Sequence, residues 1–200
     1  SFFSTSPFGR YMRDARLNTI GEGSNEVLRN FIAVVGLRDI AMKMKEVADA
    51  ASANPLSAVG KALGFGMNSL EKILSAPQVP VQSPQLQEEA AHLGKVVRKF
   101  FITLQRLIAS HKENVIEQQL ILNRLTDVVI AMYTVTAVLS RLDKDLAKAN
   151  GNKEALDLDL AKGKLYCKYA LAKVEESFDG CFKNFDLDTY KLSERLTGID

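Results

Sequence analysis

The chain contains 200 residues, of which 46% are hydrophobic, 25% charged and 8% aromatic, a composition typical of a folded globular protein with one hydrophobic core or two small ones. Lys and Arg together number 26 and Asp and Glu 24, which gives a net charge of +2. This balance argues against a polyanion-binding surface, so nucleic acid is not an expected partner.

Apolar residues recur with helical spacing along most of the chain, and alternating strand patterns are scarce. We therefore expect an all-α fold. The first helix is predicted over Phe8–Leu17. Residues 18–24 should interrupt it, because Gly21 and Gly23 each cost about 1 kcal/mol relative to alanine inside a helix and suit a tight turn.

A second helix is expected to start after this turn and to continue to about Ala51. Ser24 or Asn25 can cap its first turn, and Glu26 is favoured near the positive end of the helix dipole. Its large apolar side chains lie near one face: Leu28, Phe31, Val35 and Met42.

Between Leu56 and Leu74, apolar residues recur every three or four positions and form one stripe, although glycines weaken this helix. Two interpretations remain open, namely a marginal helix packed on other helices and an interfacial helix lying on a membrane. Lys61 and Lys72 are the only clear cations on its polar face. Residues 76–84 contain three prolines, which predicts an extended linker and a candidate domain boundary.

The second half of the chain predicts an antiparallel helical bundle. Residues 117–146 are apolar around most of the helix circumference, which indicates a central buried helix. We expect no membrane-spanning segment, because the longest apolar run, 128–139, is shorter than the roughly 20 residues that a bilayer requires. Two further helices present apolar faces made of Leu93, Val97, Phe100, Leu104 and Leu107, and of Cys167, Leu171, Val174, Phe178 and Phe182.

The two cysteines, Cys167 and Cys181, lie in helical sequence without a companion pair or a neighbouring histidine. This spacing fits neither a disulfide framework nor a zinc site. We expect two reduced, half-buried packing residues. His92 and His111 are expected on helix surfaces, and no metal site is predicted.

The pattern with the most chemical content covers residues 11–29, YMRDARLNTIGEGSNEVLR. Taken alone, a glutamate between two glycines is most often a solvated loop residue. The wider pattern, however, resembles the signature near the end of the acyl-CoA dehydrogenase catalytic domain, in which an Arg-Asp-x-Arg/Lys helix leads into Ile-aromatic-Glu-Gly-Thr-x-x-Ile/Leu-x-Arg. Gly21 stands where that signature has an aromatic residue, which would widen the substrate pocket, and Ser24 stands in place of threonine and keeps the hydroxyl.

This resemblance implies the dehydrogenation of a fatty acyl-CoA to a trans-2-enoyl-CoA, with FAD accepting hydride from the β-carbon. Glu22 corresponds to the base that removes the α-proton, a role that needs a carboxylate within hydrogen-bond reach and partly desolvated. Gly23 corresponds to a substrate-binding position. Ser24, Asn25 and Glu26 correspond to cofactor-binding positions at a helix start, where free backbone N–H groups favour anionic ligands.

Residues 117–124, EQQLILNR, and 132–141, MYTVTAVLSR, resemble the extra C-terminal domain of the very-long-chain branch of that family. The resemblance divides the chain into the end of the catalytic helical domain over 1–51, an amphipathic segment with a linker over 52–84, and an accessory bundle over 85–200. It implies electron-transferring flavoprotein as electron acceptor, a homodimer, and peripheral membrane contact through residues 55–75. The expected location is intracellular, in the bacterial cytoplasm or on the matrix or inner-membrane face of mitochondria.

The family binds FAD mainly through a middle β-domain that this sequence lacks, and the chain starts at Ser1 rather than at a methionine. We therefore expect the C-terminal piece of a longer enzyme, which alone neither retains FAD nor turns over substrate. The alternative is a non-catalytic helical interaction or membrane-docking module derived from the same family.

Overall fold

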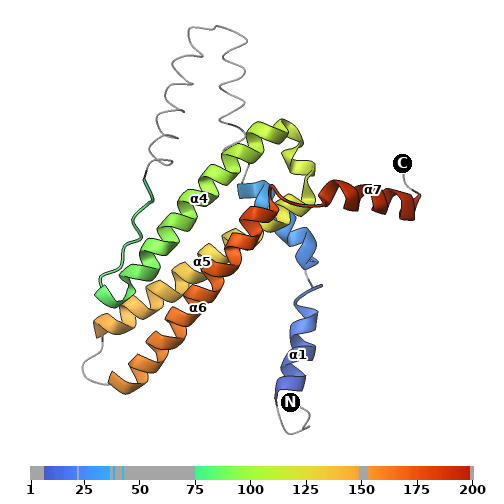
Figure 1. The fold of residues 1–200 in the computed structure, drawn as a ribbon. Helices are drawn as coiled ribbons and strands as arrows, with labels where there is room; N and C mark the ends of the chain where they lie inside the picture. The colour runs from blue at the N-terminus through green and yellow to red at the C-terminus, as the bar shows by residue number, and fades with distance from the viewer. Residues whose placement is uncertain are drawn as a thin grey trace, which may run out of the picture.

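The computed structural model describes residues 7–21, 23–36, 38, 42, 75–148 and 153–198. Within these ranges the regular structure is entirely helical, which confirms the all-α prediction. The first helix coincides with its predicted bounds, and residues 25–36 form a further helix. The labelled elements are, in chain order (Figure 1), α1 (Phe8–Leu17), η1 (Pro84–Leu86), α4 (Gln87–His111), η2 (Lys112–Glu117), α5 (Gln119–Lys148), α6 (Lys153–Gly180) and α7 (Asp186–Thr197).

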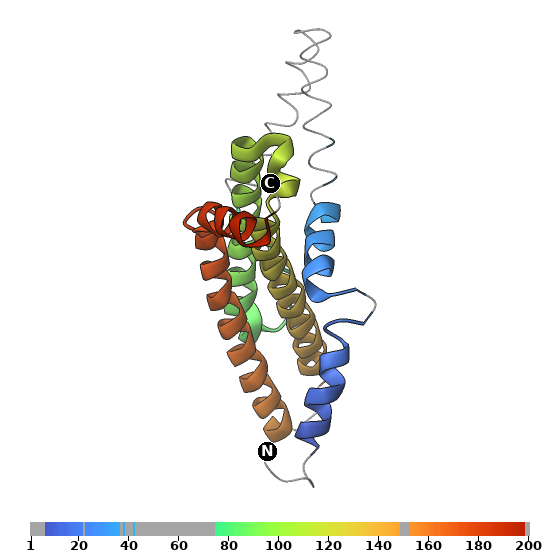
Figure 2. The same cartoon turned by 90° about the vertical axis from the view of Figure 1, so that its right-hand side faces the viewer.

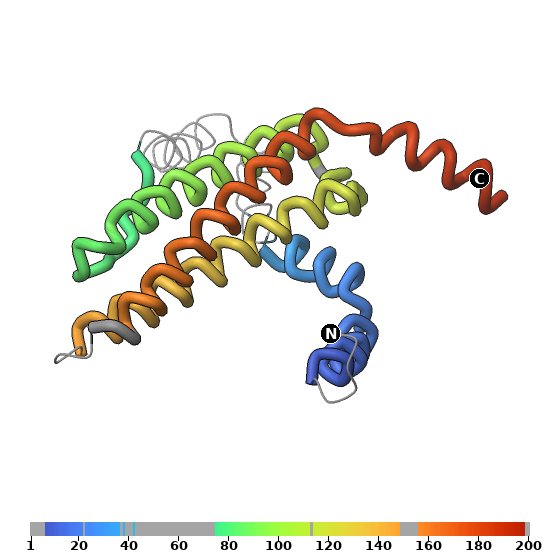
Figure 3. Tube along the Cα trace, turned by 60° about the horizontal axis from the view of Figure 1, so that its bottom comes forward, coloured from blue at the N-terminus to red at the C-terminus, as the bar shows by residue number. Residues whose placement is uncertain are grey.

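Helices α4, α5 and α6 lie side by side and alternate in direction, as Figures 1 and 3 show, so the predicted antiparallel bundle is confirmed. Their apolar faces form two buried clusters. The first joins all three helices and includes Leu93, Val128, Val135, Leu139, Cys167, Leu171, Val174 and Phe178. The second lies where α4 and α5 are joined through η2, and it includes Ala33, Leu104, Leu107, Val115, Leu122, Leu125 and Cys181.

Helix α5 is less buried than its sequence predicts. Val128, Val135 and Leu139 are buried in the bundle, but Ile130 and Tyr133 are 42% and 75% exposed. The expectation that no stretch is long enough to span a membrane is also wrong for this helix, because the 30 residues of α5 satisfy the length and composition criteria for a span. A single such helix is weak evidence for a span, because the core helix of a bundle has the same length and composition.

The extended segment 76–83 packs along the bundle as a strap. Val79 and Val81 contact the first cluster, and the carbonyl of Pro77 lies so close to Gly94 of α4 that a β-carbon there would clash. The backbone N–H groups of Gln82 and Ser83 donate to the Asp143 carboxylate at 3.0 and 2.8 Å. Together with a side-chain hydrogen bond from Ser83, these donors hold the pKa of Asp143 below its ordinary value of 3.8. The predicted extended conformation is confirmed, and the sequence did not predict the packing.

Helix α7 projects away from the bundle, as Figures 1 and 3 show. Its first residue, Asp186, accepts two hydrogen bonds from the Arg124 guanidinium of α5, at 2.6 and 2.7 Å. These hydrogen bonds raise the pKa of Arg124, and the bidentate geometry fixes where the last helix begins. The amphipathic stripe predicted over 56–74 lies outside the described residues.

Candidate functional site

The glycine-containing segment forms a hydrogen-bonded turn at the end of α1. The Thr19 hydroxyl donates to the Arg16 carbonyl at 2.7 Å, and the Gly21 N–H donates to the Leu17 carbonyl at 2.7 Å. A β-carbon at Gly21 would lie 3.1 Å from that same oxygen. The aromatic residue of the family signature would therefore be crowded by the backbone in this turn.

The next helix starts immediately after Gly23, whose φ of +118° lies in the left-handed region that favours glycine. The Ser24 carbonyl accepts the Leu28 N–H at 3.0 Å, and its hydroxyl accepts the Val27 N–H through a long contact of 3.5 Å. Ser24 is thus the N-cap, one of the two capping residues predicted. The Asn25 N–H donates back to the Thr19 carbonyl at 3.1 Å and closes the turn against the new helix.

The predicted site residues are consecutive, and the described part of the turn includes all but one of them. Glu22, the predicted base, lies outside the described residues. Gly23 and Ser24 are half-buried, whereas Asn25 and Glu26 are exposed. The roles assigned to these residues stay predictions.

Whether this turn fits a flavin depends on which polar groups its described residues leave accessible. The Asn25 and Val27 N–H groups already have partners within the turn, so few backbone donors of the helix start are available to an anion. The side chains of Asn25 and Glu26 are exposed and able to hydrogen-bond. The turn therefore fits one edge of a flavin site and cannot enclose the cofactor.

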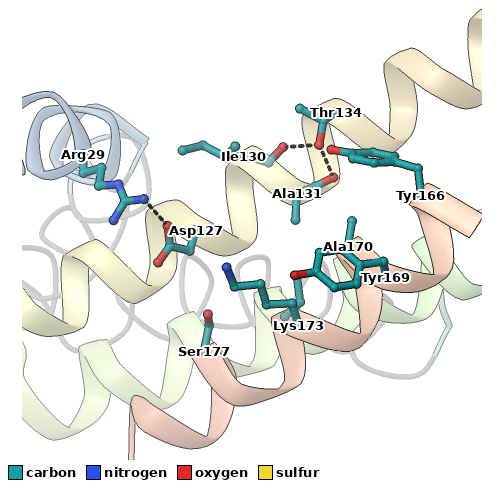
Figure 4. Close-up of a pocket in the computed structure, with 11 residues that line it drawn as sticks. Arg29, Asp127, Ile130, Ala131, Thr134, Tyr166, Tyr169, Ala170, Lys173 and Ser177 are labelled. Carbon is teal, nitrogen blue, oxygen red and sulfur yellow. Dashed lines mark hydrogen bonds and ion pairs between the residues drawn. The ribbon is translucent and has the colours of Figure 1, made fainter. Parts of the chain in front are cut away.

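The helix that follows this turn, residues 25–36, packs against α5, and Figure 2 shows the two segments side by side. The buried hydroxyl of Thr126 donates to the Arg29 carbonyl at 2.6 Å, and the Arg29 guanidinium forms an ion pair with Asp127 at 2.9 Å (Figure 4). Ala33, one turn further on, is buried in the second cluster. The predicted apolar face is not the one that docks, because Phe31 and Val35 are 63% and 52% exposed.

A groove of about 270 Å³ lies between α5 and α6 beside this contact. Its polar lining includes Thr134, Tyr166, Tyr169, Lys173 and Ser177, shown in Figure 4. A second, basic groove of about 240 Å³ follows α4, with Lys95, Lys99 and Arg106 at its wall and the Phe182 ring under Arg106. In the described part of the chain, no group of three or more potential metal ligands occurs.

Two family descriptions match this sequence. Residues 84–197 match "ACAD9/ACADV, C-terminal domain", and residues 2–37 match "Acyl-CoA dehydrogenase, C-terminal domain". The first match covers η1, the three bundle helices with η2, and α7. The second covers α1, the turn and the helix after it.

Similar proteins and a similar structure agree with these matches. The chain is 29% identical over 143 residues to the very long-chain specific acyl-CoA dehydrogenase, mitochondrial, of Rattus norvegicus, covering 70% of this chain and 22% of that protein. It is 26% identical over 201 residues to the Bos taurus protein of the same name, covering 93% and 30%. A crystal structure of an acyl-CoA dehydrogenase complexed with FAD from Bacillus anthracis superposes with a TM-score of 0.64 at 19% identity, covering 100% of this chain and 31% of that one. The chain thus spans less than a third of each.

Proposed function

Because this chain belongs to the acyl-CoA dehydrogenases through the ACAD9/ACADV C-terminal domain family, we propose that it is the C-terminal part of a flavin-dependent enzyme that oxidises long-chain fatty acyl-CoA to trans-2-enoyl-CoA. The match over 84–197 supports this proposal most strongly. The very long-chain specific names of the two mammalian relatives support the long-chain substrate. Such a reaction belongs to fatty acid β-oxidation.

In this proposal Glu22 is the base that removes the α-proton of the bound thioester. Gly21 and Gly23 on either side carry no side chain that could come between the base and the substrate. The turn that flanks Glu22 is held by five short-range hydrogen bonds, donated by the Thr19 hydroxyl and by the N–H groups of Thr19, Ile20, Gly21 and Asn25. Such preorganisation holds a base within reach of a proton without further conformational cost.

The remaining residues of the turn bind the two ligands. Gly23 lets its backbone lie against the acyl-CoA, and Ser24, Asn25 and Glu26 hydrogen-bond at the flavin edge. When bound, FAD supplies the hydride acceptor for the β-carbon. The turn supplies only one edge of that site, so the rest of the longer polypeptide provides the other contacts.

The proposal extends to partners and location. The intact enzyme is a homodimer that passes its electrons to electron-transferring flavoprotein. Residues 55–75 give it peripheral membrane contact. Its location is the bacterial cytoplasm, or the mitochondrial matrix or inner-membrane face, and the mitochondrial names of the two mammalian relatives support the second of these.

Glu22→Gln in the intact enzyme tests the proposed base. The amide is nearly isosteric but cannot accept the α-proton, so we expect flavin content to stay unchanged and palmitoyl-CoA-dependent dye reduction to fall by about 100-fold or more. Glu88→Gln, an exposed residue of α4, is the matched control and should keep full activity. Loss of flavin in the Glu22 variant would instead assign this residue a structural role, and retained turnover would point to another base.

A second candidate function is a non-catalytic interaction or membrane-docking module. The observation that favours it is the bundle itself, which has its own buried clusters and accounts for the larger family match. The discriminating observation is the reading frame upstream of Ser1. A flavin-binding domain encoded there supports the enzyme, and a start codon immediately before Ser1 supports the module.

A further inference from the structure

The contact between residues 25–36 and α5 joins the segment of the proposed catalytic turn to the accessory bundle. It connects residues 97 positions apart in the sequence, through the Thr126 hydroxyl and the Arg29 carbonyl at 2.6 Å. The Arg29–Asp127 ion pair adds a second attachment at 2.9 Å. One helical turn beyond Arg29, Ala33 is buried against the cluster that contains Leu122 and Leu125 of α5.

These attachments lie close to the turn that they hold. Arg29 is the fifth residue of the helix that starts at Asn25, so its Cα lies about 6 Å along the helix axis from that start, at 1.5 Å per residue. A helix moves as a rigid rod over so short a span. A shift or rotation at Arg29 is therefore passed on to the helix start at Asn25, which directly follows Gly23 and Ser24.

The two attachments differ in burial. A change at the exposed one can therefore move the helix without a large effect on the free energy of unfolding. The Thr126 side chain is completely buried and has the Arg29 carbonyl as its acceptor. The side chains of Arg29 and Asp127 are each more than 40% exposed, and an ion pair so exposed contributes little to folding stability. Its removal leaves the bundle folded and frees the helix to rotate about its remaining contacts.

We propose that Thr126 and Asp127 are positioning residues, which hold the helix after the proposed catalytic turn at the angle and depth that proton abstraction requires. This inference rests on the proposed function of the turn. It assigns the accessory bundle a direct part in catalysis, because a base misplaced by about 1 Å loses much of its rate even when the substrate still binds. Neither residue touches the substrate or the flavin in this account.

The test uses the intact flavoprotein with four single variants and the double variant Thr126→Val/Asp127→Asn. Thr126→Val removes the buried donor while keeping the side-chain shape, and Asp127→Asn removes the ion pair. Asp127→Glu keeps the charge and is the conservative rescue. Asp145→Asn removes the exposed Arg141–Asp145 ion pair further along the same helix and is the matched control for the loss of one charge.

Two readouts separate positioning from folding. The first is single-turnover reduction of the bound flavin by palmitoyl-CoA without oxygen, with the dissociation constant of palmitoyl-CoA measured by titration. The second is amide hydrogen exchange of peptides covering residues 18–28, which requires no activity. Flavin content and thermal midpoint are recorded for each variant.

We expect Asp127→Asn to keep its flavin, its thermal midpoint and its palmitoyl-CoA affinity within about two-fold, while its reduction rate falls about ten-fold or more. The Thr126→Val/Asp127→Asn double variant should show at least the same loss of rate with its flavin retained, and a thermal midpoint lowered by a few degrees because it also loses a buried hydrogen bond. Exchange at residues 18–28 should accelerate several-fold. Asp127→Glu should recover most of the rate, and Asp145→Asn should match the wild type. An unchanged reduction rate or unchanged exchange in the double variant would overturn the inference, as would a loss of rate accompanied by loss of flavin. No flavin reduction in the wild type would refute the proposed function itself.

Discussion

Cys167 and Cys181 lie in separate buried clusters, 14 positions apart in the chain. Burial disfavours the charged thiolate and raises the pKa of each to about 11. For Cys181 the nearby Arg124 acts in the opposite direction but does not offset the burial. Both thiols are free, as the sequence predicts, and more deeply buried than the predicted half-buried state.

We expect neither thiol to react with a disulfide reagent in the folded chain near pH 8, because only about one in a thousand would be ionised with a pKa of about 11. In urea both should react rapidly. The same shift predicts a pH dependence of stability. Above about pH 9 the unfolded thiols ionise and the folded ones do not, so the free energy of unfolding should decrease as the pH rises toward 11.

Absorbance of the released reagent measures the reaction, and urea titrations at pH 8 and pH 10 measure the stability. A Cys167→Ala/Cys181→Ala variant is the control for ionisation of other groups. Modification of one thiol per chain within minutes at pH 8 would contradict the burial. A free energy of unfolding that stays constant above pH 9 would contradict the raised pKa.

At the scale of elements, α5 and α6 approach each other closely at Gly163. A β-carbon there would clash with Leu142 and lie 3.2 Å from Val138, both on α5. Inside an open helix, glycine to alanine stabilises by about 0.5–1 kcal/mol. In this contact the added methyl group would displace the side chain of Leu142, which is packed in the first buried cluster, at a cost of roughly 1–3 kcal/mol.

Gly163→Ala should therefore lower the free energy of unfolding of the 200-residue chain, by roughly 1–2 kcal/mol after the helix-propensity gain is subtracted. The control is Gly36→Ala, because Gly36 is also helical and has open space around it. That change should leave stability equal or slightly higher. Urea denaturation followed by far-UV circular dichroism measures both, and a Gly163→Ala chain more stable than the wild type would show that the Leu142 side chain can move aside at little cost.

The helices whose apolar residues form a single stripe were predictable from the sequence. The segments against which those helices pack were not. Periodicity located the buried faces of α4 and α6, with Leu93 and Leu171 as examples. It also located the turn after Leu17, because glycine preferences act locally. It ended the apolar face of α6 too late, since Phe182 lies beyond the helix end at Gly180 and is 40% exposed.

Long-range contacts explain most of what the sequence did not predict. The hydrogen bond from Thr126 to the Arg29 carbonyl and the ion pair of Arg124 with Asp186 join residues 97 and 62 positions apart. Neither pairing follows from helical spacing, because spacing reports one element at a time. For the same reason helical spacing does not predict that the small side chain of Ala33, rather than the larger apolar residues around it, is buried against α5.

At the scale of the whole molecule, the two parts of the described chain differ in how they bury apolar side chains. Residues 75–148 and 153–198 contribute nearly all of the buried clusters. Among the described residues before position 43, Ala33 is the one buried hydrophobic side chain. Large side chains on the same segment are more than half exposed, namely Phe8, Tyr11, Met12, Leu17, Ile20, Val27, Phe31 and Val35. Such an apolar surface next to the proposed catalytic turn is what an interface with the rest of a longer enzyme would require.

This difference predicts that the 200-residue chain folds as a bundle and binds no flavin by itself. The turn supplies only exposed Asn25 and Glu26 and half-buried Gly23 and Ser24, whereas a cofactor site usually encloses most of its ligand. After mixing with FAD and gel filtration, the protein peak should show a helical circular dichroism spectrum, no visible flavin absorbance and no palmitoyl-CoA-dependent dye reduction. The intact enzyme, treated in the same way, is the positive control. Flavin that remains with the isolated chain, together with turnover, would mean that residues 1–200 form a complete active site and that the exposed apolar surface has another purpose.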